Sequence, residues 1–414
     1  MPSLRHIERA TALMEGFAEA TGLASPGTHA PRRYLWTDAF GVCNFLALHR
    51  HTGVARYGRL AEELITQVHE TLGRHRPDDP RSGWISGLPE EEGRQHPTVA
   101  GLRIGKKLPE RRPGEPFDER LEWERDGQYY HYLTKWMHAL HQAALATGKA
   151  DYLVWACELA AAAHRAFVYQ PSPGAPRRMY WKMSVDLTYP LVPSMGHHDP
   201  LDGYITFSQL ARAAAQWPGG IAAPDLSRER AELAQMCRGR DWTTDDPLGL
   251  GGLLFDACRV LQLSARGEGF EEDGPAHALL ESACRGLQIY LAGNSLRLPA
   301  EARLAFREFG LSIGLHAVEV MDDLLDTGSA AGEAEELQRL ILALAQYLPA
   351  AEAIEQFWLE TGNRRSRSWT SHEDINTVML ATSLLPDGFL MLGPAAPAGA
   401  GSPPASREGS SQGA

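Results

Sequence analysis

The chain has 414 residues, of which 43% are apolar and 22% are charged. This composition supports a large buried core and excludes a disordered or fibrous protein. The formal net charge of −12 excludes nucleic acid as the main partner, because phosphate binding requires a basic face.

The sequence carries no pattern typical of secretion or of a membrane span. Residues 1–17 form a charged amphipathic pattern rather than a basic segment followed by an apolar one. No apolar run approaches the roughly 20 residues that cross a bilayer. The five cysteines are spread through apolar stretches without a CxxC pair, which is typical of buried free thiols in a reducing compartment. We therefore expect a cytoplasmic protein that binds no membrane, and the sequence does not indicate its oligomeric state.

Helical periodicity dominates the chain, and caps and breakers predict about twelve helices. In chain order they lie near residues 3–22, 37–52, 55–75, 127–147, 149–168, 201–216, 225–238, 247–265, 274–293, 300–322, 333–358 and 372–385. Two long loops interrupt the series at residues 77–126 and 169–200, with short strands possible at 179–187. Loops of that length in a compact domain are functional or disordered. We expect residues 1–390 to form one all-α domain and residues 391–414, rich in Ala, Gly, Pro and Ser, to form a disordered tail.

An internal repeat identifies how the helices are joined. The segments Thr52-Gly53-Val54-Ala55-Arg56-Tyr57 and Thr147-Gly148-Lys149-Ala150-Asp151-Tyr152 share Thr, Gly, Ala and Tyr at the same offsets, and both continue with Ala and Leu at helical spacing. The glycine can end one helix with a positive φ, and the next helix then starts at once and packs back. A tight helical hairpin used twice indicates an architecture of repeated helix pairs.

This hairpin turn, TG-x-A-x-Y-x3-A-x2-L, together with about twelve helices, resembles the six-hairpin (α/α)6 toroids. That superfamily includes glycoside hydrolases, unsaturated glucuronyl hydrolases and N-acylglucosamine 2-epimerases. The resemblance implies an all-α toroid over residues 1–390. It also implies an inner ring of alternate helices, with the substrate pocket at their N-terminal ends.

Every segment that leads into a predicted inner helix carries a carboxylate. These segments are Trp36-Thr37-Asp38, residues 126–131, residues 196–203, Thr244-Asp245-Asp246-Pro247, Pro299-Ala300-Glu301 and Ser371-His372-Glu373-Asp374. Acidic residues also favour the first turn of any helix, where they cap it and meet the positive end of its dipole. That preference does not explain the aromatic and histidine residues beside them, so a pocket and simple capping both remain open.

The segment 196–203, GHHDPLDG, is the most polar of these helix starts. Its residues His197, His198, Asp199 and Asp202 could act as acid and base, bind sugar hydroxyls or hold a metal. A four-ligand metal site from this segment is sterically hard, because His197 and His198 point apart. A shared site of His198, Asp199 and His372 is the metal alternative. We expect no metal and no cofactor.

The run 126–136, DGQYYHYLTKW, places Tyr129, Tyr132 and Trp136 on one helical stripe. Such a stripe is typical of core packing, but buried phenol and imidazole groups need polar partners and the first turn should face the pocket. We expect Trp136 to pack and the following residues to contact substrate: Trp36, Tyr129, Tyr130, His131, Trp181, His197 and Asp202. His316 and Glu319 share a helix face late in their helix, away from the expected pocket, and we interpret them as structural.

The sequence leaves the enzymatic activity open among three hypotheses. The first is a glycoside hydrolase acting on a small carbohydrate, which needs a protonated acid and a second carboxylate. Our candidates are Asp126 and Asp199, with Asp38 and Glu373 in reserve, and no argument assigns acid against base. The second is a sugar epimerase or isomerase with a histidine pair, His198 with His372 or His131 with His198. The third is a non-catalytic ring that binds a ligand or serves as a scaffold.

Overall fold

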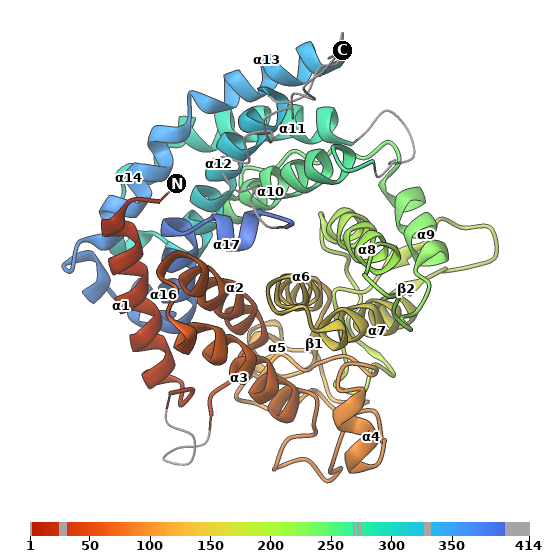
Figure 1. Ribbon diagram of the computed structural model, residues 1–414. Coiled ribbons are helices and arrows are strands. Elements are labelled where there is room, and N and C mark those ends of the chain that lie inside the picture. Colours follow the sequence, from red (N-terminus) through yellow and green to blue (C-terminus); the bar gives the residue numbers. More distant parts are fainter. Residues whose placement is uncertain (1, 25–30, 268–269, 271–274, 327–332, 394–414) are drawn as a thin grey trace, which may run out of the picture.

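The computed structural model describes residues 2–24, 31–267, 270, 275–326 and 333–393, which form an all-α toroid (Figure 1). Within the described residues, six helices make the inner ring. These are α2 (Leu35–Thr52), α6 (Tyr130–Thr147), α8 (Asp199–Ala215), α10 (Pro247–Ser264), α12 (Ala305–Asp326) and α16 (Glu373–Leu384). Each packs against the next, and α16 packs against α2, so the ring closes.

The outer layer consists of helices that each pack against an inner one. They are α1 (Leu4–Ala20), α3 (Ala55–Leu72), α7 (Ala150–Phe167), α9 (Ser227–Cys237), α11 (Ala276–Ala292), α13 (Glu333–Ala345) and α14 (Leu348–Leu359). The extent to which a helix is buried depends on its layer. Inner α2 is buried at every position from Leu35 to Leu48, whereas outer α3 buries one face at helical spacing. The helix boundaries predicted from the sequence agree with the structure to within a few residues at most ends.

Two predicted helices differ from the observed ones. The helix expected at 333–358 is two helices, α13 and α14, because Pro349 in the first turn of α14 cannot continue the preceding helix. The helix expected at 300–322 begins with the 3-10 turn η2 (Ala300–Ala302), and α12 starts only at Ala305. Short helices not expected from the sequence are α15 (Arg367–Thr370), α17 (Asp387–Leu390), η1 (Ser295–Arg297) and η3 (Asn363–Arg365).

The two copies of the repeated turn have the same geometry. Gly53 and Gly148 both end their helices with a φ of 70°, in the left-handed region. In each copy the preceding threonine hydroxyl donates to a carbonyl oxygen four residues back, at 2.6 Å for Thr52 and 2.7 Å for Thr147. The same hydroxyl accepts the backbone N–H two residues further on. The repeat is therefore a structural unit that turns the chain between the two layers.

The two long segments expected as loops carry short elements that join them together. The first contains α4 (Glu90–Gln95) and α5 (Glu119–Glu124). The second contains β3 (Arg178–Met179), which pairs with β2 (Val168–Tyr169), and β4 (Lys182–Met183), which pairs with both β1 (Gln128–Tyr129) and β5 (Pro190–Val192). The small sheet β1-β4-β5 is antiparallel and lies at the N-terminal end of α6. It fixes both segments over the end of the ring where the inner helices begin.

The other end of the ring is closed by α17, which contacts α2, α6 and α10. Its Phe389 ring stacks on Phe40, with centroids 4.6 Å apart and planes at 16°. Residues 391–393, expected from the sequence to belong to the tail, are bound to the ring instead. Gln142 donates to the Met391 carbonyl oxygen at 2.7 Å, and the Leu392 N–H donates to Gln262 at 2.9 Å. The remainder of the predicted tail, residues 394–414, lies outside the described residues.

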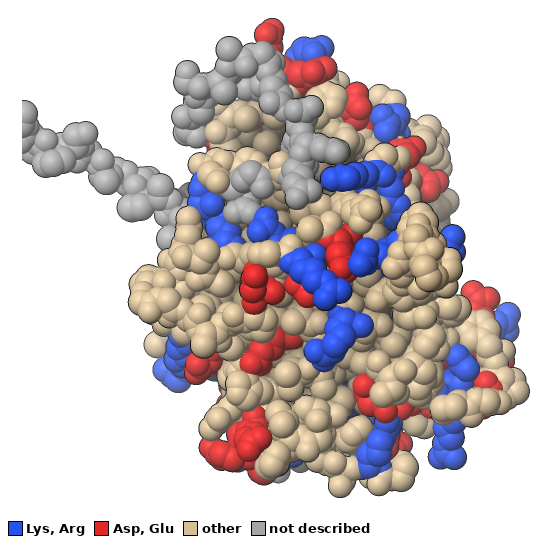
Figure 2. Space-filling model, turned by 90° about the vertical axis from the view of Figure 1, so that its right-hand side faces the viewer, with Lys and Arg blue, Asp and Glu red and all other residues tan. Residues whose placement is uncertain are grey.

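No helix in the described part of the chain is long and apolar enough to cross a membrane. All five cysteines fall within the described residues and are free thiols; Cys43, Cys157 and Cys258 are buried. Figure 2 shows the face that carries α8 and α9, where basic side chains in the middle have acidic ones beside them. Charges of both signs are therefore interspersed on this face.

Candidate active site

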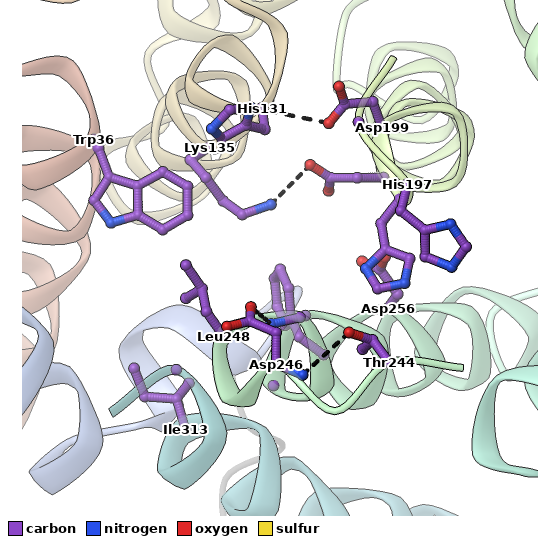
Figure 3. A pocket seen from close by; sticks show the side chains of 18 of the residues that line it. Trp36, His131, Lys135, His197, Asp199, Thr244, Asp246, Leu248, Asp256 and Ile313 are labelled. Carbon is purple, nitrogen blue, oxygen red and sulfur yellow. Dashed lines mark hydrogen bonds and ion pairs between the residues drawn. The ribbon is translucent and has the colours of Figure 1, made fainter. Parts of the chain in front are cut away.

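A cavity of about 510 Å³ opens where the inner helices begin (Figure 3). This volume is in the range of small-molecule sites. Every inner helix contributes to its wall, and Phe389 of α17 lies at its floor. Its polar lining consists of His131, Lys135, Ser194, His197, His198, Asp199, Asp202, Thr244, Asp246 and Asp256. Its apolar lining includes Trp36, Phe40, Trp181, Met195, Leu248, Phe255, Ile313, Met379 and Phe389.

Close contact between α10 and α12 depends on glycines at the cavity wall. A Cβ atom on Gly251 would lie 1.8 Å from the carbonyl oxygen of Gly310. Two backbones this close leave no room for a side chain. The glycines thus bring the two helices together and keep that part of the wall free of side chains.

Asp202 is the centre of a buried charge network. Its carboxylate lies 2.8 Å from Lys135 Nζ and 2.7 Å from Arg259 Nη2, and it accepts the Thr134 hydroxyl at 2.5 Å. Burial opposes ionisation, but the charges of Lys135 and Arg259 outweigh it and hold the pKa of Asp202 well below its usual range. Asp202 is therefore a fixed anion that positions Lys135 at the cavity wall.

Asp256 lies beside the same arginine, 2.5 Å from Arg259 Nη2. Burial raises the pKa of Asp256 to about 6, and the nearby Asp202 adds to the rise. The charge of Arg259 opposes this rise in the pKa of Asp256 without cancelling it.

Asp199 differs from both of these aspartates because no Lys or Arg among the described residues is paired with it. It is buried, its Oδ1 lies 3.9 Å from His131 Nδ1, and its Oδ2 has no hydrogen-bond partner among the described residues. The side chain fits against Gly196, where a Cβ atom would lie 2.3 Å from the carboxylate. Burial and the charge of Asp202 raise its pKa to about 7, against the weaker opposing effect of the Gly196 backbone N–H. Asp199 can therefore hold a proton near neutral pH.

Two of the cavity histidines, His131 and His198, are held in the neutral form. Burial, with the charge of Lys135, lowers the pKa of His131 to about 4. Burial also lowers the pKa of His198 to about 4. His198 Nε2 lies 3.0 Å from the Trp242 carbonyl oxygen, so that nitrogen carries the hydrogen and Nδ1 is left as an acceptor. Neutral imidazoles at these two positions can accept a proton.

Asp246 lies on the wall opposite Asp199 (Figure 3). It is the N-cap of α10, where its Oδ2 accepts the Gly249 N–H at 2.9 Å, and its Oδ1 pairs with Arg307. Its place at a helix start predicted a capping role, and it does cap the helix. Asp246 also lines the cavity, so the same side chain caps the helix and can contact a ligand.

The structure brings part of the predicted site together and leaves the rest outside. The predicted residues that line the cavity are Trp36, His131, Trp181, His197, His198, Asp199 and Asp202. Those that do not line it are Asp38, Asp126, Tyr129, Tyr130, His372 and Glu373. The cause differs from residue to residue.

Asp126 and Asp38 form ion pairs and hydrogen bonds that stabilise the fold. The carboxylate of Asp126 is fully buried, 2.9 Å from Arg103 Nη1, and it accepts the Gly105 N–H at 3.0 Å. The carboxylate of Asp38 lies 3.4 Å from Arg33 Nη1 and accepts the Tyr34 N–H at 2.9 Å. These pairs fix the first long segment and the first turn of α2.

The other predicted residues lie beside the cavity or above it. Tyr129 packs 5.3 Å from the Trp181 ring, and Tyr130 is fully buried against Gly203. Glu373 and His372 are exposed at the start of α16. The expectation that the whole first turn of α6 faces the pocket is therefore correct for His131 and not for its two neighbours.

His316 and Glu319 pair with each other at 3.1 Å, away from the cavity lining. His316 also contacts buried Glu355 at 2.8 Å. Burial opposes protonation, but the two carboxylates outweigh it and raise the pKa of His316 to about 9. This cluster ties α12 to α14, in agreement with a structural interpretation.

Three cavity or cavity-supporting charges were missed from the sequence: Lys135, Asp256 and Arg259. Lys135 follows His131 by one helical turn, so the two share a face. Asp256 and Arg259 stand at i, i+3 inside an otherwise apolar stretch of α10. Because charged residues inside a buried helix must be paired, the spacing of Asp256 and Arg259 could have indicated a buried ion pair. Among the described residues, no group of three or more His, Cys, Asp or Glu is arranged to hold a metal ion.

The closed ring of inner helices with its outer layer defines the fold of the chain as an (α/α)6 toroid, and similar solved structures share this fold. The GH76 α-mannanase from Bacteroides thetaiotaomicron superposes with a TM-score of 0.51 and 10% identity over 91% of this chain and 96% of that one. A D-mannose isomerase gives 0.49 and 13% over 93% and 98%. The cellobiose 2-epimerase from Spirochaeta thermophila gives 0.44 and 12% over 83% and 98%. No family model and no curated protein matches the chain.

Proposed function

We propose that the chain is a carbohydrate-active enzyme that hydrolyses a glycosidic bond in this cavity, with Asp199 as the general acid. The observation that carries the proposal is the state of Asp199, which lines the cavity, is paired with no Lys or Arg among the described residues and has its pKa raised to about 7. A general acid must hold its proton at the working pH and have it directed at the leaving oxygen. The likeness of the fold to an α-mannanase supports the substrate class.

Asp246 is the second carboxylate of the proposal. It lines the facing wall and is held in place by Arg307 and the Gly249 N–H. Asp199 would donate its proton to the leaving oxygen while water attacks the anomeric carbon and gives a proton to Asp246. Direct attack by Asp246 on the anomeric carbon would instead retain the configuration. NMR of the first-formed anomer distinguishes the two routes.

The remaining lining suits a sugar. Trp36 and Trp181 offer aromatic faces for the C–H side of a sugar ring, and Lys135 and His197 offer donors for hydroxyl groups. Lys135 is itself fixed by Asp202, so its position in the wall is set before a ligand binds.

The test compares two leaving groups on a panel of aryl α- and β-glycosides that includes mannosides and glucosides. In Asp199→Asn, we expect kcat to fall about 10²- to 10⁴-fold for a poor leaving group such as phenyl. It should fall far less for dinitrophenyl, which departs without protonation. Asp245→Asn is the matched control, since Asp245 is an exposed neighbour of Asp246 that does not line the cavity. Equal losses on both leaving groups would contradict the assignment of Asp199.

A sugar isomerase or epimerase is the second candidate, and the neutral imidazole of His131 beside Asp199 is the observation that favours it. A neutral imidazole can remove a proton next to a carbonyl. Incubation of mannose, glucose and cellobiose in D2O would place deuterium in the recovered sugar if this reaction occurs. Hydrolysis without deuterium uptake would exclude it. Binding of sugars without either reaction would leave the non-catalytic ring.

A further inference from the structure

A continuous series of aromatic rings leads from the cavity to the protein surface. Trp36 lies 6.0 Å from His131, and His131 stacks on Trp181 at 6.1 Å with planes 17° apart. Trp181 then meets Trp123 edge to face at 5.1 Å. The first three residues line the cavity, whereas Trp123 lies beyond it on α5.

Exposure rises along this series. Trp36 is 6% exposed, Trp181 is half-buried and Trp123 is 46% exposed. An indole ring exposed to this degree loses the benefit of burial, so its position needs another explanation. An aromatic face at the surface, in line with aromatic faces in a cavity, can stack on a ligand that extends out of it.

Buried contacts of neighbouring residues hold the Trp123 ring in place. The neighbouring residue Glu122 is buried, and its carboxylate accepts a hydrogen bond from Lys182 Nζ at 2.9 Å. The same amine donates to the Arg125 carbonyl oxygen at 2.9 Å. Lys182 directly follows Trp181, so one buried amine fixes α5 relative to the strand next to Trp181. Tyr129 packs against both indoles, at 5.3 Å from Trp181 and 6.5 Å from Trp123. The two indoles thus have a fixed mutual arrangement, with their planes 79° apart, although they come from different long segments.

We propose that Trp123 is an outer sugar-binding subsite, and that the substrate is accordingly an oligosaccharide that extends from Asp199 to α5. This inference rests on the proposed function, because the inner end of the ligand is the sugar bound in the cavity. It assigns a role to the two long segments: each contributes one indole to a binding surface continuous with the cavity. It favours a chain of several sugar units over a free monosaccharide.

The experiment measures binding in solution by calorimetry, using manno-, malto- and cello-oligosaccharides of one to five units. We expect the affinity of the wild-type protein for one series to rise with chain length. In Trp123→Ala, the gain from the outer units should fall about three- to tenfold, with binding of the shortest ligand unchanged. Leu121→Ala is the matched control, because Leu121 is 42% exposed on the same helix and lies two residues away, on another side.

The outcomes separate the subsite from the proposed reaction. Turnover of aryl monosaccharides, with no dependence on chain length, would overturn the subsite and leave the hydrolase standing. Binding that depends on chain length and on Trp123, without turnover, would keep the subsite and overturn the hydrolase. Failure of every series to bind would overturn both. Self-association in sedimentation that Trp123→Ala abolishes, without any effect on sugar binding, would assign the exposed ring to a protein contact and overturn the subsite.

Discussion

The segments 126–131 and 196–203 have much in common in the sequence. Each follows a long loop, begins an inner helix and contains both aspartate and histidine. In the structure, Asp126 is fully buried against Arg103 and backbone N–H groups, outside the cavity lining. Asp199 lines the cavity, and no Lys or Arg among the described residues is paired with it. An acidic residue that is paired with a buried cation holds the fold together, and one that lines the cavity without such a partner is available for chemistry.

Exchanging the two carboxyl groups for amides gives the largest expected effects. Asp126→Asn leaves Arg103 buried beside a neutral group, and we expect a loss of about 3–5 kcal/mol in the free energy of unfolding. Asp199→Asn removes no ion pair with a cation, so its free energy of unfolding should change by less than about 1 kcal/mol. Urea denaturation of both variants measures this difference. If Asp199→Asn lost as much unfolding free energy as Asp126→Asn, the proposed difference between the two carboxyl groups would be wrong.

The pH dependence of activity sharpens the same contrast. Asp199 must be protonated to act as an acid, so activity should decline as the pH rises through about 7. In Asp202→Asn the neighbouring negative charge is lost while Lys135 remains, which lowers the pKa of Asp199. The alkaline limb of the kcat/KM profile should therefore move to lower pH. An unmoved limb would show that another group controls it.

His316 extends the comparison to histidines inside and outside the cavity. Its pKa is raised to about 9 in the folded protein, above the unfolded value near 6.5, so the folded state binds the extra proton. The stability that this proton contributes is fully present below pH 6.5 and is lost as the pH rises to 9. We expect a loss on the order of 3 kcal/mol between these limits. His316→Gln should flatten the stability profile over this range, whereas the cavity residue His131, with a pKa of about 4, should not titrate within it in an NMR experiment.

A small effect on stability, with none on activity, is expected at the repeated hairpin, far from either segment. Gly148 has a φ of 70°, and a methyl group added at its Cα would meet no atom within 4 Å. Gly148→Ala should therefore cost only the backbone strain, about 1 kcal/mol in the free energy of unfolding. Activity should remain at the wild-type level, which a thermal melt and an assay together would check. A large loss of activity would mean that the turn affects the cavity.

Much of the architecture was set by local signals. The 3.6-residue periodicity located the main helices, and the Thr-Gly turn fixed how Thr52 and Thr147 close their hairpins. These features depend on residues a few positions apart, which the sequence displays directly. The break at Pro349 was also visible there, although the periodicity on both sides of it favoured one long helix.

The identity of the available acid was decided only by the tertiary structure. Asp126 finds its partner at Arg103, and Asp202 finds Lys135 and Arg259 on two other helices. Hydrogen-bond partners and burial set the pKa of a carboxyl group, and both come from chain segments that folding brings together. The sequence by itself thus determined a ring with acidic residues at its inner helix ends. Folding determined that Asp199 is the one among Asp126, Asp199 and Asp202 that no cation pairs with, because the arginines and the lysine meet the other two.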